Sequence, residues 1–231
     1  MRVAIMQPYF LPYIGYFKLI SQVDTFVVYD DVNFIKRGWI NRNNILVNEK
    51  AFLFTVPLKL ASQNKLINEI EIDINSIWKD SLLKTIQLSY AKAPFFEEVY
   101  PIIEEIVGFK EKNISKFIIY SLKRICDFLD IKTNILISSE IRKNNDLKGQ
   151  EKIIEICQKL GATEYLNASG GKDLYEQNEF LNKNICLKFI GSSSITYSQF
   201  KNTFIPYLSI IDVMMFNSSK SIVEFLNSDN L

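Results

Sequence analysis

Short apolar runs and helical spacings alternate along the chain, and they predict where its strands and helices lie. Val3–Met6 and Thr25–Tyr29 are apolar, β-rich runs that predict two buried strands. Between them, apolar residues recur with helical spacing from Tyr13 to Ser21. Together they predict a β-loop-α-β unit, and such units cross over right-handed into a parallel sheet.

The pattern changes twice in the middle of the chain. Asn44–Asn48 and Ala51–Leu60 predict a hairpin turned at Glu49-Lys50. From Ser76 onward the period becomes helical and predicts helices at Ile77–Tyr90, Phe96–Val107 and Ser115–Leu129. These segments carry few candidate chemical groups. We therefore expect a covering or partner-binding helical layer, inserted at about residues 76–130.

The last third returns to alternating strands and helices. It predicts strands at Asn134–Ser138, Thr163–Asn167 and Ile185–Ile190, and helices at Leu147–Leu160 and Tyr207–Phe216. Because there is no internal repeat and no long linker, we expect one domain over residues 1–231. The predicted fold class is α/β, a mostly parallel, doubly wound sheet that is Rossmann-like and nucleotidylyltransferase-like, with the inserted helical layer.

Composition narrows the chemistry. The chain has 27 Lys+Arg against 26 Asp+Glu, so no global field favours nucleic acid, and any anion must be held locally. Histidine is absent, which excludes Ser-His-Asp and Cys-His nucleophile systems. The three cysteines fit neither a disulfide framework nor a zinc pattern, and we assign no metal site. We expect a cytoplasmic protein with reduced core thiols and no transmembrane segment.

Pro12 to Tyr16 form the turn after the first predicted strand, where α/β folds hold phosphates on backbone amides and a helix N-terminus. The stretch is similar to the nucleotidylyltransferase signature, with Tyr13 and Tyr16 in place of its two histidines and Gly15 retained. A tyrosine can donate a hydrogen bond to phosphate but stays neutral near pH 7. Simple packing of these aromatic residues is the alternative.

Polar side chains follow both of the first two strands. Gln7 ends the first strand, and Asp30 and Asp31 end the second. Ligands in open α/β sheets sit at the carboxyl ends of strands. We therefore expect Gln7 as a polar donor and Asp30 or Asp31 as a base or amine orienter, with a structural cap as the alternative for either carboxylate.

A basic cluster with interleaved aromatic residues comes next. Its candidate ligand-binding residues are Lys36, Arg37, Trp39, Asn41 and Arg42. Arginine binds phosphate or carboxylate through pairs of hydrogen bonds, and tryptophan stacks on bases or sugar rings. The cluster therefore suits a pyrophosphate-linked ligand. Gly170 and Gly171 form a second candidate, a phosphate-binding turn that lacks P-loop spacing. Asp212, inside an apolar helix, requires a partner in the core or in the site.

Four motifs together resemble the WbqC-like protein family. They are QPYFLPYIGYFKLI at 7–20, DTFVVYDDVNFIKRGWINRN at 24–43, YLNASGGKDLY at 165–175 and YLSIIDVMMFN at 207–217. The resemblance covers most of the chain. It implies a role in bacterial O-antigen or other surface-polysaccharide biosynthesis, as a cytosolic step on a nucleotide-activated sugar.

The function that this resemblance implies is acyl or aminoacyl transfer to the amine of a nucleotide-linked amino sugar. Because the amine is itself the nucleophile, a carboxylate and one or two donors suffice. The sequence does not choose between an activated acyl or aminoacyl donor and ATP with Mg²⁺ as the co-substrate. It also does not decide whether the protein forms a homo-oligomer. Two alternatives remain, a nucleotidylyl or adenylyl transferase and a non-catalytic scaffold of a polysaccharide assembly complex.

Overall fold

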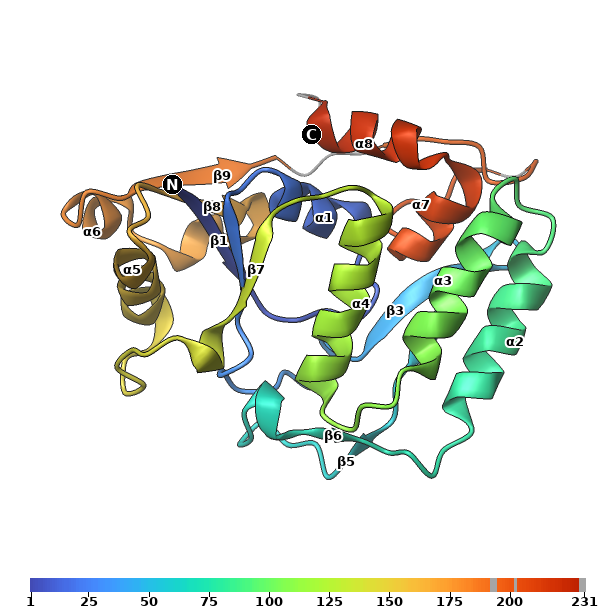
Figure 1. Cartoon of the computed structure of the whole chain (residues 1–231), viewed down its shortest axis with the longest axis horizontal. Coiled ribbons are helices and arrows are strands. Elements are labelled where there is room, and N and C mark those ends of the chain that lie inside the picture. Colours follow the sequence, from blue (N-terminus) through green and yellow to red (C-terminus); the bar gives the residue numbers. More distant parts are fainter. Residues whose placement is uncertain (192–194, 202, 229–231) are drawn as a thin grey trace.

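A parallel sheet of five strands lies at the centre of the computed structural model, which describes residues 1–191, 195–201 and 203–228 (Figure 1). Its strand order is β7-β2-β1-β8-β9. The strands are β1 (Arg2–Met6), β2 (Thr25–Val28), β7 (Asn134–Ile137), β8 (Glu164–Ala168) and β9 (Cys186–Ile190). All neighbouring strands pair in parallel. From β1 the chain first adds β2 and β7 on one side, and it later adds β8 and β9 on the other side of β1. The topological switch point of the sheet therefore lies between β1 and β8.

Helices cover both faces of the sheet, so the predicted doubly wound, Rossmann-like α/β fold is confirmed. Successive residues of a strand point to opposite faces. Val3 and Ile5 of β1 pack with α5 (Gly149–Leu160) and α6 (Gln177–Leu181), and Ala4 between them packs on the other side. On that second side lie α1 (Ile14–Ser21) and α4 (Ile114–Phe128), as Figure 1 shows. Two further helices, α7 (Ile210–Phe216) and α8 (Ser219–Asn227), belong to the same apolar core, and α8 packs on α1.

The predicted hairpin forms, but its turn and its second strand differ from the prediction. β3 (Arg42–Val47) pairs antiparallel with β4 (Lys50–Thr55). Asn48 and Glu49 take the turn, and both have left-handed backbones, as a two-residue hairpin turn requires. After Pro57 the chain starts β5 (Leu58–Lys59), which pairs with β6 (Glu71–Ile72) rather than continuing the hairpin.

The helical segment lies between β6 and β7, close to the predicted bounds. It contains α2 (Trp78–Tyr90), α3 (Phe96–Gly108) and α4, and it shares one apolar core with the α1 face of the sheet. α4 begins one residue before the predicted Ser115: the side chain of Asn113 caps it, and Ser115 is buried inside its first turn. Short 3₁₀ turns complete the structure: η1 (Ile67–Glu69), η2 (Ser138–Glu140) and η3 (Ser169–Leu174).

No helix in the described ranges is both long and apolar enough to cross a bilayer. Cys126 and Cys157 are buried as expected, and burial raises the pKa of both thiols to about 12. Cys186 is exposed, which the sequence did not predict.

The carboxylate of Asp212 is fully buried and finds its partners within the core. Tyr90 donates to Oδ1 at 2.8 Å, and Tyr197 and Gln199 donate to Oδ2 at 2.6 Å each. Burial raises the pKa of Asp212, and these hydrogen bonds only partly offset the effect. The cluster joins α7 to α2 and to the segment around Tyr197, so the carboxylate is a structural link between distant parts of the chain.

Replacing Tyr197 by Phe removes one donor from this buried carboxylate. We expect Tyr197→Phe to lower the free energy of unfolding by about 1.5–3 kcal/mol, the usual worth of a hydrogen bond to a charged group. Tyr207, which is 68% exposed, provides the matched control. Urea denaturation of Tyr207→Phe should match the wild type, and equal losses in both variants would contradict the account.

Candidate active site

Several of the predicted site residues meet at the carboxyl edge of the sheet. Met6 of β1 is in register with Val28 of β2, and the amide of Tyr29 donates to the Met6 carbonyl at 2.7 Å. Gln7 and Asp31 therefore follow neighbouring strands at the same edge. Gly170 and Gly171 lie in η3, directly after β8 on the other side of β1. The sheet thus gathers residues that are far apart in sequence at its switch point.

A hollow of about 280 Å³ opens at this edge, between the end of β2 and the start of α5. We call it the carboxyl-edge hollow. Its lining residues are Tyr29, Asp31, Val32, Asn33, Leu66, Asn145, Leu147, Lys148, Gly149 and Lys152. Of the two candidate carboxylates, Asp31 lines the hollow and Asp30 does not.

Asp31 holds two buried lysines. The Nζ of Lys143 lies 2.8 Å from its Oδ2, and the Nζ of Lys152 lies 3.0 Å from the same oxygen. The side chains of the two lysines are 1% and 6% exposed, and that of Asp31 is 8% exposed. The Nζ of Lys152 also donates to the Asp31 carbonyl at 2.9 Å. Both oxygens of Asp31 are shielded from solvent, and besides the two lysines the Ser138 hydroxyl also stabilises the carboxylate.

These contacts keep Asp31 ionised. Burial alone would raise its pKa, but hydrogen bonds from Lys143, Ser138 and Lys152 and the charge of Lys143 outweigh burial, so the pKa is lowered. A carboxylate with a low pKa is a weak proton acceptor at neutral pH but a good acceptor of N–H hydrogen bonds. Tyr29 stands beside it, and burial, followed by the charge of Asp31, raises the pKa of the Tyr29 hydroxyl. Asp31 is therefore suited to orienting a donor group.

Asp30 points away from the hollow and fastens the sheet edge. Its Oδ1 accepts from the Ser139 amide at 3.0 Å, and its Oδ2 accepts from the hydroxyls of Ser139 at 2.8 Å and Ser115 at 3.4 Å. Burial raises the pKa of Asp30, and the Ser139 hydrogen bonds lower it by less. The bonds tie the end of β2 to η2 and to the start of α4. Asp30 therefore matches the structural alternative that its position in the sequence allowed.

The turn at Pro12 to Tyr16 is closed by its own aromatic side chains. Tyr16 is 2% exposed, donates to the Gln7 carbonyl at 2.8 Å and packs against Phe26. A Cβ added at Gly15 would lie 2.4 Å from Cε2 of Tyr13, so the absent side chain makes room for that ring. Packing accounts for Gly15 and Tyr16, while Tyr13, 37% exposed, lies at a small pocket beside Tyr197 and Tyr207.

The basic cluster forms a loop, and none of its five residues lines the carboxyl-edge hollow. Arg42 donates to the carbonyls of Gly38, at 2.8 Å, and Arg37, and its guanidinium lies 5.8 Å from the centre of the Trp39 ring. Asn41 donates to the Val56 carbonyl at 2.8 Å. Arg42 and Asn41 thus hold the loop together. Lys36 and Arg37 are exposed at its tip.

The turn after β8 is tightly packed at Gly171. A Cβ there would meet the Asn167 amide nitrogen at 2.7 Å, whereas nothing lies within 4 Å of the same position on Gly170. The side chain of Asn167 is buried and accepts from the Ala168 amide at 2.8 Å. Gly171 is thus explained by packing, and Gly170 is the more open of the two.

The sequence reading missed the lysines of the site. Lys152 had a detectable signal, since it lies one turn before Ile156 on the apolar face of its helix and a cation there requires a partner. Lys143 had none, because it lies in an irregular segment. The pairing joins Asp31 to a residue 121 positions away, which local patterns do not encode.

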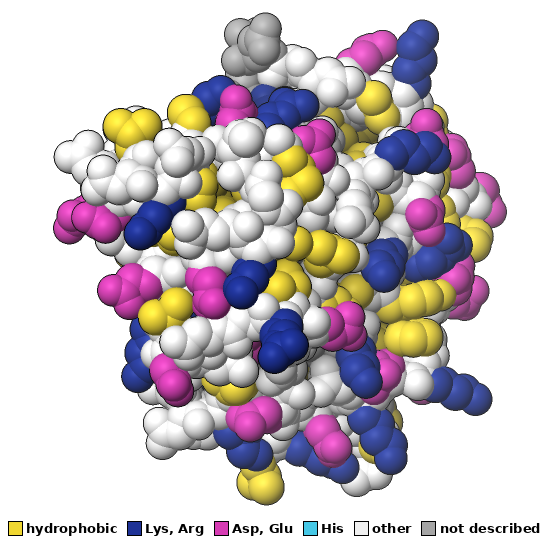
Figure 2. All heavy atoms as spheres, turned by 60° about the vertical axis from the view of Figure 1, so that its left-hand side comes forward, with side chains coloured by type: hydrophobic (Ala, Val, Ile, Leu, Met, Phe, Trp, Pro, Cys, Tyr) yellow, Lys and Arg dark blue, Asp and Glu magenta, His cyan; other side chains and the backbone are white. Residues whose placement is uncertain are grey.

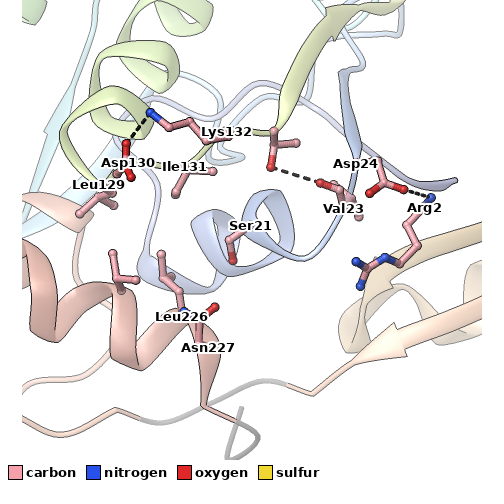
Figure 3. Close-up of a pocket in the computed structure, with 12 residues that line it drawn as sticks. Arg2, Ser21, Val23, Asp24, Leu129, Asp130, Ile131, Lys132, Leu226 and Asn227 are labelled. Atoms are coloured by element: carbon pink, nitrogen blue, oxygen red, sulfur yellow. Dashed lines mark hydrogen bonds and ion pairs between the residues drawn. The ribbon is translucent and has the colours of Figure 1, made fainter.

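A second hollow, of about 490 Å³, lies at the opposite, amino edge of the sheet (Figure 3). Three of its charged residues have partners nearby: Lys132 pairs with Asp130, and Asp24 accepts from the Arg2 amide at 2.7 Å. Asp130 and Lys132 are each 81% exposed. The carboxyl edge is the better candidate, because Asp31 and Lys152 line its hollow and are both buried.

The surface around α5 and α6 carries no large patch of one sign. Figure 2 shows this side of the molecule with lysines and arginines interspersed among acidic residues. Across the described ranges, no three Cys, Asp or Glu residues come together in a way that could hold a metal ion. The carboxyl edge is therefore distinguished by the buried ion pairs of Asp31, and not by the charge of the surrounding surface.

The fold and site define an α/β protein with a Rossmann-like sheet and a charged hollow at its carboxyl edge. The model of the WbqC-like protein family matches residues 7–224, so the chain belongs to that family, as its motifs predicted. Among curated proteins it is similar to "Uncharacterized protein Rv1507c" of Mycobacterium tuberculosis (strain ATCC 25618 / H37Rv), with 28% identity over 228 residues that cover 97% of each chain. No solved structure matches the chain.

The lowered pKa of Asp31 predicts a specific dependence of stability on pH. Ionised Asp31 stabilises the fold above its ordinary pKa of 3.8, and this contribution is lost as the pH falls through the lower folded-state value. At pH 7 we expect Asp31→Asn to cost about 3–5 kcal/mol, because it leaves two buried ammonium groups without a counter-charge.

Urea denaturation of wild type and Asp31→Asn from pH 7 down to pH 2 measures the effect. The difference between them should shrink as the pH falls, since the wild-type carboxylate becomes protonated. The exposed Asp146 gives the control, and Asp146→Asn should follow the wild type throughout. A difference for Asp31→Asn that is small at pH 7, or constant with pH, would contradict the ion-pair account.

Proposed function

We propose that this protein is a transferase of surface-polysaccharide biosynthesis that acts on a nucleotide-activated amino sugar, by acyl or aminoacyl transfer to the amine. Membership of the WbqC-like family supports the pathway. The observation that carries the proposal is the buried, ionised Asp31, which lines the hollow at the carboxyl edge of a Rossmann-like sheet. This is the edge at which open α/β sheets bind nucleotides and related ligands.

The role of Asp31 in this reaction is to orient the amine. Its Oδ2 is the oxygen nearest to Lys143 and Lys152, and we assign Oδ1 as the acceptor of an N–H from the sugar. Because the pKa of Asp31 is lowered, the carboxylate holds the amine rather than removing its proton at neutral pH. The amine is the nucleophile, so fixing its direction toward the acyl carbon is the main requirement of the step.

The rest of the substrate is assigned to the neighbouring strand ends. Gln7 follows β1 and is a candidate polar donor, and the open turn at Gly170 follows β8 across the switch point. Lys36 and Arg37, exposed on the loop after β2, are candidate contacts for outer phosphate oxygens. In this assignment the ligand extends from the carboxyl-edge hollow along the edge of the sheet.

The adenylyl-transfer alternative loses the feature that motivated it. Tyr16 is committed to the Gln7 carbonyl and the core, and Gly15 lies under the Tyr13 ring. The turn is therefore filled by its own side chains where a phosphate would approach. We favour the transferase because its candidate residue, Asp31, is ionised and lines a hollow.

The proposal predicts selective binding of amino sugars. In thermal-shift experiments with UDP-, dTDP- and GDP-linked sugars, at least one amino sugar should raise the melting temperature, since ligands that bind only the folded state stabilise it. The matched control is the same nucleotide sugar with a hydroxyl in place of the amine, which should stabilise less because it lacks the N–H donors that Asp31 accepts.

Asp31→Asn gives the second control, since it should abolish the preference for the amine in a variant that still folds at the assay temperature. The proposal fails if no nucleotide sugar stabilises a well-folded wild-type sample. It also fails if the amine and hydroxyl forms stabilise the wild type equally.

A further inference from the structure

The ammonium group of Lys152 has a hydrogen-bond donor left over. Its Nζ carries three N–H groups, of which one goes to the Asp31 carbonyl and one to Oδ2. No acceptor for the third was found within the described residues, and the Tyr29 ring lies 5.4 Å away. Lys152 lines the carboxyl-edge hollow although its side chain is only 6% exposed. The remaining N–H of this ammonium group is the one available to an acceptor in the hollow.

Lys143 differs from Lys152 in this respect. It approaches Oδ2 of Asp31 and donates to the carbonyls of Ser138 and, at 3.4 Å, Ile141. All three of its donors are used, and it does not line the hollow. Lys143 therefore fixes the position of Asp31, while Lys152 is the cation that faces the ligand space.

The start of α5 adds positive potential to the same wall. Gly149 begins this 12-residue helix, and the preceding Lys148 makes no side-chain hydrogen bond to the first turn. The amides of a first helical turn lack partners inside the helix, and the helix dipole is positive at that end. Lysines at a helix N-terminus are locally unfavourable, and the first turn sets only the exposed Glu151 against Lys148 and Lys152. An anion bound between the lysines would lower that cost.

The charge balance selects an anion over a cation. Among the buried groups, Lys143 and Lys152 flank one carboxylate, Asp31, and the neighbouring buried carboxylate, Asp30, is taken up by Ser139 and Ser115. Lys148 and Glu151, which also lie at this end of α5, are exposed to solvent. A second ammonium brought near Lys152 would be repelled, whereas an oxyanion would neutralise the excess positive charge in a buried setting where it counts most.

We infer that the carboxyl-edge hollow is an oxyanion subsite, which holds the phosphate of a nucleoside diphosphate or the carboxylate of an acyl or aminoacyl donor through Lys152, Lys148 and the first-turn amides of α5. Its volume of about 280 Å³ fits such a group and is below the range that encloses a whole cofactor-sized ligand. The two sources named for the oxyanion rest on the proposed function, whereas the subsite itself rests on the lysines and the helix.

Inorganic probes test the subsite directly. The full chain is titrated with sodium pyrophosphate and, separately, sodium acetate at constant ionic strength, followed by calorimetry and by NMR of the amides of residues 149–151. We expect at least one probe to bind and to shift those amides. Stronger binding of pyrophosphate identifies the phosphate source, and stronger binding of acetate identifies the carboxylate source.

Three lysine variants make the test specific. Lys152→Met should raise the Kd about tenfold or more, as expected for losing a charged hydrogen bond. Lys148→Ala changes an exposed side chain, so folding is preserved, and it should raise the Kd about two- to fivefold. Lys159→Met, at the exposed far end of α5, is the control and should bind like the wild type.

The subsite is ruled out if neither probe binds the folded wild type, or if Lys148→Ala and Lys152→Met both bind as the wild type does. Nucleotide-sugar binding measured on the same variants separates this inference from the proposed function. If both lysine variants bind the nucleotide-linked amino sugar with the wild-type Kd, the subsite is contradicted and the proposed function is not. Oxyanion binding that depends on Lys152, without any nucleotide-sugar binding, contradicts the proposed function alone.

Discussion

A carboxylate and two ammonium groups, all removed from water, determine the structure of the carboxyl edge. Burial of Asp31, Lys143 and Lys152 is tolerable only because each lysine lies within 3.0 Å of the same oxygen and also donates to backbone carbonyls. The three residues come from the end of β2, the segment after β7 and the first turns of α5. Their contact therefore fixes the distance between the sheet edge and the helix that together form the hollow.

The two consecutive aspartates show how one strand end serves both structure and ligand space. Both residues follow the end of β2, and their side chains contact different parts of the fold. Asp30 thus reaches Ser139 and Ser115 and fastens the edge, while Asp31 faces α5. The tie at Asp30 and the ion pairs at Asp31 hold the same strand end from both sides. A rigid strand end of this kind is what a positioning role for Asp31 requires.

The sheet was predictable from sequence because its strands are short apolar runs that end in polar residues, and the helix that ends at Gly161 has the left-handed glycine that such an end requires. The edge position of Gln7 and Asp31 followed from the same pattern. The structural roles of Tyr16 and Arg42 could not be predicted in this way, because the same residue types serve in packing and in ligand binding. The Lys143 and Lys152 partners of Asp31 depend on how α5 docks on the sheet, a property of the assembled fold.

A crystal structure of the chain with a bound nucleotide-linked amino sugar tests the central claim most directly. The account predicts the ligand at the carboxyl edge, with its amine beside Oδ1 of Asp31 and an oxyanion within hydrogen-bond distance of Lys152 and the first turn of α5. A ligand bound instead at the hollow of the amino edge, or one that leaves Asp31 and Lys152 without contact, would contradict it.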